Sequence, residues 1–367
     1  MQILRKSNWE GFKKITKMKR KEIINKVKES GLKGRSGSNF LTGLKWELIG
    51  KGTRYLICNA DEGEPGTFKD KFILENNPQL MIEGIAIASY AMDIHSAFIY
   101  LRGEYSYLKP KLEKIIKQSE IYLKKIKLNI EIVPGAGSYL CGEETAILES
   151  IEGNRPIVRR KPPYPSESGL NSNPTCINNV ETLANIPLIF LGEWDNNLQL
   201  FSLSGDLKKP GIYEIELGTK LEHIISCGKP KKELKAVYFG GSGGCLPYEK
   251  FKNLRVDEKT ISGKGAVLGA RSLIAVGKDR NIVDISKTIS EFFVHESCGY
   301  CTPCREGNFR VLELLDKIKD RKARIIDVKL LEKLAYHISD TSYCALGVSS
   351  TTHLKCALKY FKDEFRV

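Results

Sequence analysis

The sequence predicts an α/β domain with a largely parallel sheet, then a small mixed α/β domain, then a helical domain that carries a cluster of cysteines. Three observations predict this order. Apolar strands alternate with helical stretches in the first half, a hairpin pattern follows near residue 200, and the last part has a helical apolar period. At 367 residues the chain is longer than one typical compact domain, which favours two or three.

The first domain is predicted from its alternation of strands and helices. Strands are expected at 54–58, 97–101 and 129–133. Helices are expected at 19–30, 79–92 and 108–124. This alternation indicates βαβ units, whose strands are parallel. The proline-rich connection at 160–169, which leads into the polar segment 171–184, is expected to be an ordered loop.

The two following domains are predicted from a change of pattern near Leu200. Alternating residues flank a Lys-Lys-Pro-Gly turn at 208–211, which predicts a hairpin, and further strands are expected at 236–239 and 272–276. The segment 285–365 is helical by its period and contains a cysteine-bearing turn. The expected domain boundaries are 1–198, 199–280 and 281–367.

Composition excludes several classes of protein. The N-terminus has no apolar stretch of signal-peptide length, and nowhere do about 18 apolar residues run without a charge, so we expect a soluble intracellular protein. The net charge is +14, but the lysines are scattered along predicted helices, so nucleic-acid binding is not expected. Ten cysteines are too sparse for a disulfide scaffold, which leaves metal ligation or reactive thiols for the clustered ones.

Three cysteines recur at every third residue, namely Cys298, Cys301 and Cys304, where a helix is expected to start. A fourth ligand must come from elsewhere, and on local sequence both Cys344 and Cys356 qualify. Four thiolates suit a [4Fe-4S] cluster. Structural zinc also accepts four thiolates but usually takes them in two pairs, so the pattern favours the cluster over zinc.

The other five cysteines are isolated among apolar or glycine-rich neighbours. They are Cys58, Cys141, Cys176, Cys227 and Cys245. A buried, inert thiol is the ordinary case in such surroundings, and none is predicted to be functional.

Two glycine-rich segments are candidates for ligand binding. The segment 31–46 combines many glycines with the cations Arg35 and Lys45, so it predicts either a phosphate site or an ordinary turn. The acidic loop at 59–70 follows a parallel strand, at the sheet edge where α/β proteins bind ligands. Its carboxylates would accept hydrogen bonds from ligand hydroxyls or cap the next helix. A second glycine and acid element at 135–145 is expected to face the same pocket.

Six motifs in one order make this chain resemble the NADH-binding flavoprotein subunit of respiratory complex I. They are Gly-Arg-x-Gly at 34–37, NADEGEPGTFKD at 59–70, GAGSYLCGEET at 135–145, ESIEGNRPIVRRKPPYP at 149–165, INNVETLANIP at 177–187 and ESCGYCTPCREG at 296–307. The same family includes flavoprotein subunits of NAD-linked hydrogenases and formate dehydrogenases. The resemblance implies a Rossmann-like domain for FMN and NADH, a ubiquitin-like α+β domain, and a C-terminal helical domain with one [4Fe-4S] cluster.

The resemblance also implies roles for individual residues. The FMN phosphate and adjacent groups would be flanked by Gly34, Arg35, Gly37 and Lys45. The flavin ring and ribityl chain would be contacted by Asn59, Asp61, Glu62, Asn178 and Asn179, and Gly142 and Glu143 belong to the same cofactor-binding set. Positions that hold NADH in the family are matched by Phe40, Lys161 and Tyr164. In the hydride-transfer step, Glu64 and Glu144 would position the nicotinamide or ribose groups.

The cluster ligands implied by the resemblance are Cys298, Cys301, Cys304 and Cys344. Cys344 is preferred to Cys356 because Cys-Ala-Leu-Gly matches the final cysteine motif of the family.

The chain departs from the family in one loop and one nearby position. The usual GRGGAGFPTG reads GRSGSNFLTG here, which changes four residues to Ser36, Ser38, Asn39 and Leu41. Asn39 tolerates positive φ better than most residues that could replace glycine. Leu48 stands where an aromatic residue is expected against adenine. We therefore expect altered nucleotide affinity or preference.

The implied function is that of an NADH dehydrogenase subunit through which electrons enter a larger complex. NADH would transfer hydride to FMN, and single electrons would pass through the cluster to a thioredoxin-like [2Fe-2S] subunit and a larger multi-cluster subunit. The expected location is the cytoplasm, with membrane contact only through a complex peripheral to the inner membrane. The sequence does not decide to which complex the subunit belongs, or whether its nucleotide is NADH or NADPH. The alternative is a flavin-free electron-wire or structural subunit that retains only the cluster, which the loop departures motivate.

Overall fold

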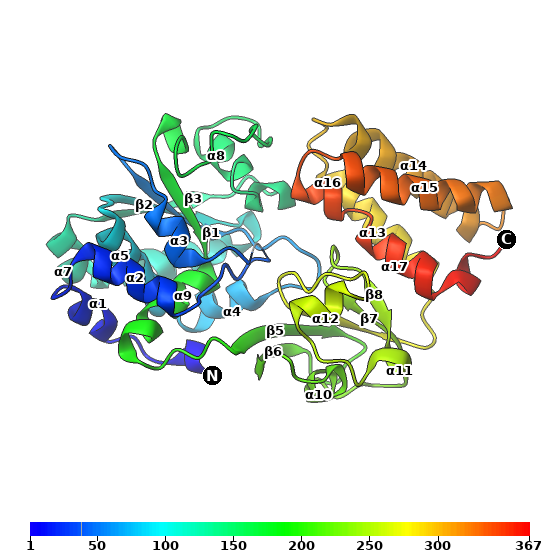
Figure 1. Cartoon of the computed structure of the whole chain (residues 1–367), viewed down its shortest axis with the longest axis horizontal. Helices are drawn as coiled ribbons and strands as arrows, with labels where there is room; N and C mark the ends of the chain where they lie inside the picture. The colour runs from blue at the N-terminus through cyan, green and yellow to red at the C-terminus, as the bar shows by residue number, and fades with distance from the viewer. Residues whose placement is uncertain (38) are drawn as a thin grey trace. The chain divides into compact units, whose positions relative to one another are not determined.

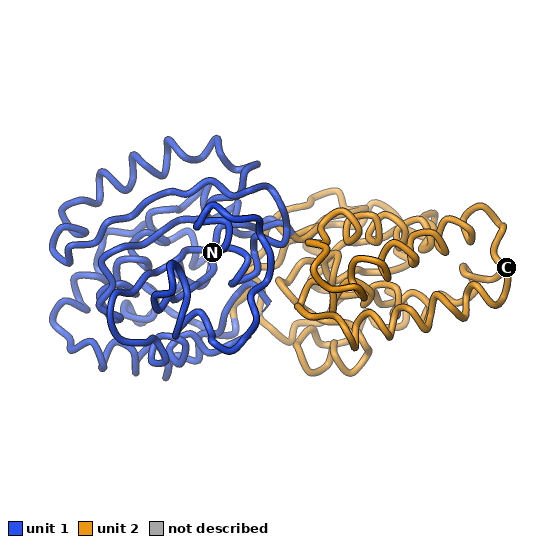
Figure 2. Tube along the Cα trace, turned by 90° about the horizontal axis from the view of Figure 1, so that it is seen from above, with its two compact units in different colours: residues 1–63, 68–197 blue, residues 64–67, 198–367 orange. Residues whose placement is uncertain are grey.

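The computed structural model describes residues 1–37 and 39–367, and the chain divides into two compact units (Figure 2). Unit 1 consists of Met1–Gly63 and Phe68–Asn197, and unit 2 consists of Glu64–Thr67 and Leu198–Val367. A four-residue segment of unit 2 therefore interrupts unit 1 in the sequence. Ser38, one of the four departures in the glycine-rich loop, lies outside the described residues.

Unit 1 contains a four-stranded sheet with the order β3-β2-β1-β4, in which all neighbouring strands are parallel (Figure 1). Its strands are β1 (Tyr55–Ala60), β2 (Ser96–Leu101), β3 (Asn129–Pro134) and β4 (Thr175–Asn179). The predicted parallel sheet and its first three strands are confirmed. The prediction of a loop is wrong for β4, whose residues are all buried and pair with β1. Tertiary pairing there outweighs the low strand propensity of asparagine.

Helices cover both faces of this sheet. Their bounds are α1 (Glu10–Ile15), α2 (Arg20–Glu29), α3 (Thr42–Glu47), α4 (Lys69–Asn76), α5 (Pro78–Met92), α6 (Lys109–Gln118), α7 (Glu120–Leu123), α8 (Ala146–Ile151) and α9 (Val180–Leu191). Successive residues of β1 point to opposite faces. Cys58 Sγ lies 3.5 Å from Met81 Sδ of α5, whereas Ile57 packs in one cluster with Ile147 and Leu148 of α8. Burial on both faces is usual for parallel strands.

Helices α5 and α9 approach each other closely at Gly84 of α5. A Cβ atom at this position would lie 1.9 Å from the backbone oxygen of Leu183 in α9. Both helices are apolar on almost every face and are nearly completely buried, as expected for helices inside a core. The predicted helix at 108–124 is instead divided into α6 and α7 at the buried Ser119, whose Oγ donates to the carbonyl oxygen of Ile115 at 2.8 Å. Such back-bonding competes with regular helix continuation.

Unit 2 begins with a mixed five-stranded sheet with the order β6-β5-β9-β7-β8 (Figure 1). Its strands are β5 (Leu198–Gly205), β6 (Gly211–Glu216), β7 (Leu234–Phe239), β8 (Cys245–Pro247) and β9 (Ser272–Gly277). The pairs β5/β6, β7/β8 and β7/β9 are antiparallel, and β5/β9 is parallel. The predicted hairpin and the mixed α/β character are confirmed. Short helices accompany the sheet, namely α10 (Leu221–Cys227), α11 (Tyr248–Phe251) and α12 (Glu258–Ser262).

The rest of unit 2 is helical, as predicted. It contains α13 (Ile282–Glu296), α14 (Thr302–Lys319), α15 (Ile325–Thr341), α16 (Ala345–Ser349) and α17 (Thr352–Tyr360). The side chain of Asn281 caps α13 by accepting from the N–H groups of Val283 and Asp284, at 2.7 and 3.2 Å. Within the described part of the chain, no helix combines the length and apolar character that crossing a bilayer requires.

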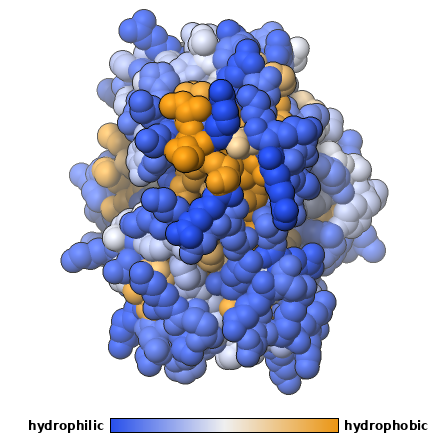
Figure 3. Space-filling model, turned by 90° about the vertical axis from the view of Figure 1, so that its right-hand side faces the viewer, coloured by the Kyte–Doolittle hydropathy of each residue, from blue (hydrophilic) through white to orange (hydrophobic). Residues whose placement is uncertain are grey.

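Apolar side chains also gather on the surface. Figure 3 shows a face on which hydrophobic residues form a patch bordered by hydrophilic ones. On α15, Ile325, Ile326 and Leu330 remain 68%, 60% and 45% exposed. Larger exposed apolar patches mark interaction sites in soluble proteins.

Candidate functional site

The glycine-rich loop between α2 and α3 is closed by its own backbone. The N–H of Gly34 donates to the carbonyl oxygen of Phe40 at 2.9 Å. Gly37 and Asn39 have φ values of +99° and +50°, so both occupy the region that favours glycine. Asparagine enters this region more readily than most side chains, and the loop accommodates Asn39 in that conformation. Phe40 is 43% exposed at the end of the loop.

The two cations of this segment have different surroundings. Arg35 is buried, with its guanidinium 5.2 Å from the ring centre of Trp194 and its Nε 3.9 Å from Glu181 Oε1. Lys45 is partly exposed on α3, and its Nζ donates to the carbonyl oxygen of Ile177 in β4 at 3.1 Å. Lys45 therefore lies beside the middle of β4.

A cluster of two lysines and two glutamates lies beside α8. Lys161 Nζ is 3.0 Å from Glu143 Oε1 and 2.6 Å from Glu144 Oε1, and Lys45 Nζ is 3.4 Å from Glu144 Oε2. Burial alone would raise the pKa of Glu144, but Lys45 and Lys161 outweigh burial and lower it. The other oxygen of Glu143 accepts from the N–H of Ala146 at 2.9 Å and so caps α8. Glu143 thus stabilises the loop, while Glu144 is held between two cations.

Glu62, in the acidic loop after β1, is a buried helix cap. Its two oxygens accept from the N–H groups of Asp70 and Lys71, at 2.9 and 3.0 Å, at the start of α4. The capping alternative for one carboxylate of this loop is therefore confirmed. Burial, and next the charge of Asp70, raise the pKa of Glu62 to about 7.

Asparagine side chains in two strands hold the neighbouring loop and helix in place. Asn59 at the end of β1 donates from Nδ2 to the carbonyl oxygen of Gly142 at 2.8 Å and accepts from the N–H of Asp61 at 3.0 Å. Asn178 in β4 accepts from the indole Nε1 of Trp46 in α3 at 3.0 Å. The predicted residues of three separate motifs thus meet at one edge of the sheet.

Behind this edge lies a buried ionic network that sequence reasoning missed. Lys69 Nζ is 2.7 Å from Asp70 Oδ1 and 3.1 Å from Glu181 Oε2, and its residue is 1% exposed. Asn179 donates to Asp70 and accepts from the N–H of Glu181, which caps α9. Burial lowers the pKa of Lys69, but the neighbouring carboxylates outweigh it and the pKa is raised. Lys69 and Asp70 belong to the motif at 59–70, but no periodicity in the sequence indicates that they are buried.

Three further predicted positions are placed separately. Glu64 belongs to unit 2, where its Oε1 accepts from the hydroxyl and, at 3.3 Å, from the N–H of Ser242. Tyr164 is 53% exposed in unit 1. Leu48, which replaces an expected aromatic residue, is 55% exposed just after α3.

The chemistry of this donor set fits FMN. Lys45 would offer a cation to the phosphate, beside a loop whose glycines permit close approach of the backbone. Asn59 and Asp61 lie at the carboxyl end of a parallel strand, where their polar groups would suit ribityl hydroxyls.

The four predicted cluster ligands are brought together in unit 2. Cys298 and Cys301 lie in the turn between α13 and α14, Cys304 lies in the first turn of α14, and Cys344 directly precedes α16. Burial raises the pKa of Cys304 to about 11, and charge on the other three thiols contributes to this increase. Cys304 is buried, whereas the other three are partly exposed. Four thiols of this kind fit an iron-sulfur cluster.

Cys356, the other candidate for fourth ligand, lies elsewhere. It is buried, and its Sγ donates to the carbonyl oxygen of Gly265 at 3.2 Å. In the described residues no three His, Cys, Asp or Glu side chains are grouped so that they could hold a single metal ion.

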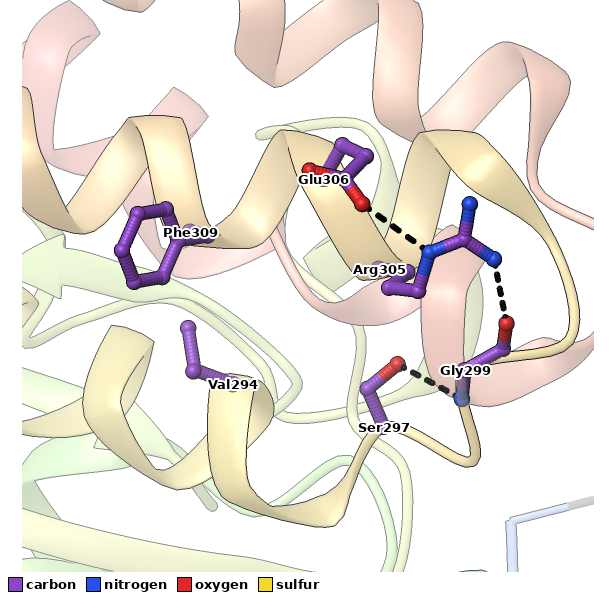
Figure 4. Close-up of a pocket in the computed structure, with 6 residues that line it drawn as sticks. All are labelled: Val294, Ser297, Gly299, Arg305, Glu306 and Phe309. Carbon is purple, nitrogen blue, oxygen red and sulfur yellow. Dashed lines mark hydrogen bonds and ion pairs between the residues drawn. The ribbon is translucent and has the colours of Figure 1, made fainter.

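A pocket of about 390 Å³ adjoins the cysteine turn (Figure 4). Val294 and Phe309 contribute apolar walls, and Arg305 points toward the turn (Figure 4). Arg305 Nη1 donates to the carbonyl oxygen of Gly299 at 2.6 Å, and the N–H of Gly299 donates to Ser297 Oγ at 3.3 Å. Because Gly299 lies between two of the predicted ligands, Cys298 and Cys301, these bonds fix the shape of the turn.

Four of the five isolated cysteines are buried, as predicted, namely Cys58, Cys141, Cys176 and Cys245. Burial raises the pKa of each of these four thiols. The prediction is wrong for Cys227, which is exposed at the end of α10. The buried face of that short helix is occupied by other apolar residues.

A ligand site at the carboxyl edge of a parallel sheet, and four gathered thiols in a helical region, define the class of flavin and iron-sulfur proteins. Two family models match the chain, the Nuo51 FMN-binding domain at residues 27–188 and the NADH-ubiquinone oxidoreductase-F iron-sulfur binding region at 284–367. The chain belongs to the family of FMN-binding, iron-sulfur subunits of NADH-quinone oxidoreductase. The resemblance, the fold class and the predicted FMN-binding and iron-sulfur regions are thereby confirmed.

Relatives in two organisms illustrate the similarity. The chain is 42% identical to an NADH-quinone oxidoreductase subunit of Buchnera aphidicola subsp. Acyrthosiphon pisum, over 96% of this chain and 86% of the relative. It is 37% identical to the corresponding NADH-quinone oxidoreductase subunit of Escherichia coli K12, over 98% and 87%. A crystal structure of an NAD⁺-reducing [NiFe]-hydrogenase in the H₂-reduced state matches with a TM-score of 0.91 and 33% identity. That match covers 97% of this chain and spans 64% of the hydrogenase chain.

Proposed function

We propose that this chain is the electron-entry subunit of a multi-subunit oxidoreductase, which oxidises NADH and passes single electrons through a [4Fe-4S] cluster to partner subunits. The observation that carries the proposal is the presence in one chain of the FMN-type donor set and the four gathered thiols. Membership of the NADH-quinone oxidoreductase family supports it. When bound, FMN supplies the conversion between two-electron hydride chemistry and one-electron transfer.

The residues of unit 1 divide into those that face the cofactor and those that support the loops. Lys45 provides positive charge beside the glycine-rich loop, and Asn59 and Asp61 provide polar groups at the strand end. Arg35 is buried against Trp194, and its contact with the FMN phosphate is proposed from the family motif alone. Glu62 and Glu143 support the two acidic loops, because their oxygens cap α4 and α8. The contacts of Gly34, Gly37, Gly142, Asn178 and Asn179 with the cofactor are proposed from the family motifs.

NADH is proposed to bind against the exposed aromatic side chains Phe40 and Tyr164, near Lys161. Hydride transfer requires no acid or base from the protein, so Glu64 and Glu144 act by positioning the nicotinamide and ribose. Glu144 is suited to this role because its charge is fixed by two lysines. The protein's contribution to hydride transfer is to hold the reacting atoms of NADH and FMN close together.

The partners proposed for the cluster are a thioredoxin-like [2Fe-2S] subunit and a larger multi-cluster subunit. The exposed apolar residues of α15 are a candidate contact for one of them. We propose a cytoplasmic location, peripheral to the inner membrane where the complex is membrane-bound. Within unit 2, residues 199–280 and 281–367 are proposed to be separate ubiquitin-like and cluster-bearing domains.

The test is anaerobic purification with flavin and iron analysis, followed by NADH addition with ferricyanide as acceptor. One FMN, about four irons and NADH-dependent bleaching of the flavin absorbance are expected for a cluster of this type. Iron without flavin would support the electron-wire alternative. Zinc in place of iron would contradict the redox function.

A variant tests the positioning role of Glu144. Glu144→Gln removes the negative charge between Lys45 and Lys161, and we expect the KM for NADH in the ferricyanide assay to rise about tenfold, or about 1.4 kcal/mol. Glu120→Gln, which breaks an exposed ion pair with Lys124, is the control and is expected to leave KM unchanged. An unchanged KM in Glu144→Gln would exclude Glu144 from nucleotide binding.

A further inference from the structure

The four cluster ligands do not have equal surroundings. Cys304 is 5% exposed, whereas the other three are partly exposed. One helical turn after it, Asn308 is 1% exposed, and its Nδ2 donates to Cys304 Sγ at 3.4 Å and to the Cys304 carbonyl oxygen at 2.9 Å. Residues four apart on a helix share one face, which explains the contact.

A buried asparagine in a helix interior needs an explanation. Asparagine is among the weaker helix formers, and burial of its amide is unfavourable without hydrogen bonds. The next buried residue of the same helix is the apolar Val311, which is the usual choice for such a position. At Asn308 the amide nitrogen is instead directed to one residue, Cys304, through its sulfur and its carbonyl group.

A second donor reaches the same sulfur. Ser297 Oγ lies 3.4 Å from Cys304 Sγ. The same Oγ accepts from the N–H of Gly299 at 3.3 Å (Figure 4). A ligating cysteine is a thiolate and has no proton to give, so in that state the hydroxyl of Ser297 is the donor. Cys304 thus accepts from both an amide and a hydroxyl group.

We propose that Asn308, together with Ser297, raises the reduction potential of the cluster by donating a hydrogen bond to the thiolate of Cys304. The proposal rests on the four-cysteine cluster of the proposed function. When the cluster accepts one electron its sulfurs become more negative, and a hydrogen bond to a more negative acceptor is stronger. The donor therefore stabilises the reduced state more than the oxidised one, as hydrogen bonds to cluster sulfurs generally do. Asn308 is a positioning residue that acts through its ligand.

The experiment is a potentiometric titration of the full chain with its cluster, followed by the electron paramagnetic resonance signal of the reduced cluster. Asn308→Leu removes the donor, and we expect the equilibrium constant for one-electron reduction to fall about tenfold, a shift of about 59 mV to lower potential. Ser297→Ala is expected to shift it in the same direction. Val311→Ala, a buried apolar change one turn further along α14 and seven residues after Cys304, is the control and is expected to leave the potential unchanged.

The results distinguish an effect of Asn308 on the reduction potential from a requirement for Asn308 in holding the cluster. If Asn308→Leu retains four irons and its potential equals that of the parent chain, the proposal is overturned. Should that variant lose its iron, Asn308→Ala makes the same test without the bulk of leucine. If both variants lose the cluster while Val311→Ala retains it, tuning is refuted and Asn308 is required for cluster retention instead. A parent chain without a four-iron cluster would refute the proposed function itself, which separates the two failures.

Discussion

Replacing Lys69 by methionine should strongly destabilise unit 1. Lys69 is 1% exposed and lies between Asp70 and Glu181, at 2.7 and 3.1 Å, and both acids are also buried. Methionine fills most of the volume of the lysine stem but leaves Asp70 without its cation, and leaves Glu181 with Arg35 alone, at 3.9 Å. Breaking a buried ion pair by removing one partner costs about 3–5 kcal/mol, because the remaining charge is buried without compensation.

The free energy of unfolding that Lys69→Met loses should also depend on pH, because Lys69 lies near the titrating carboxyl group of Glu62. Burial raises the pKa of Glu62 to about 7 from its ordinary 4.5, while Lys69 opposes this increase. Between these pH values the folded state binds a proton that the unfolded chain has released, so the free energy of unfolding falls as pH rises through this window. Without Lys69 the pKa of Glu62 rises further, so the pH range over which the free energy of unfolding falls extends to higher pH. The deficit of Lys69→Met should therefore be larger at pH 8 than at pH 5.

Tryptophan fluorescence during urea unfolding measures this effect in unit 1 alone. All three tryptophans of the chain lie in unit 1, namely Trp9, Trp46 and Trp194. The control is Lys124→Met, which breaks a pair of similar length, 2.6 Å, between side chains that are 76% and 50% exposed. An exposed pair contributes less than about 1 kcal/mol. If Lys69→Met loses no more than this control, or if its deficit shrinks as pH rises, the reasoning is refuted.

Three further changes have defined outcomes. Gly84→Ala places a Cβ 1.9 Å from the backbone of Leu183, so the urea midpoint of the tryptophan signal should fall by the equivalent of about 1–3 kcal/mol, and an unchanged midpoint would contradict it. Asp206→Ala should lower the melting temperature at pH 7. The hydrogen bond from Arg280 lowers the pKa of Asp206 in the folded state, so this difference should begin to shrink as the pH of the melting experiment falls below about 3.9 and disappear below the lowered pKa. Asn281→Ala should cost about 1 kcal/mol and speed hydrogen exchange at the start of α13, whereas Asn281→Asp should not.

The parts of the fold that were predicted are those in which side-chain pattern and structure agree. β1 and β2 are apolar runs, and burial on both faces of a parallel sheet requires such runs. The edge strand β3 instead alternates buried and exposed residues, which is the period of a strand with one covered face. β4 contains two asparagines and follows a proline, and its strand conformation comes from pairing with β1, which is distant in sequence. The pattern of side chains in a single sequence does not reveal which distant strands pair, so the pairing of β4 with β1 could not be predicted.

The site was predicted at the level of motifs, but the partners of individual side chains were not. Glu62 and Glu144 both stand in glycine-rich acidic loops, yet one caps a helix and the other pairs with lysines. Which role each takes depends on the direction of the side chain. Asn308 is visible in the sequence four residues after Cys304, but its burial beside the sulfur depends on the packing of α14.

The four-residue segment Glu64–Thr67 has a consequence for synthesis of the chain. It belongs to unit 2, where Glu64 accepts hydrogen bonds from Ser242 and the carbonyl oxygen of Pro65 accepts from the N–H of Gly241 at 3.2 Å. These partners are translated about 178 residues later, which takes roughly 10 to 35 s at ordinary elongation rates. Unit 1 itself ends at Asn197, 45 residues before Ser242 (242 − 197), so its last strand and helix are translated before the partners of Glu64. Unit 1 can therefore start to become compact while a short stretch within it still lacks the rest of its own unit.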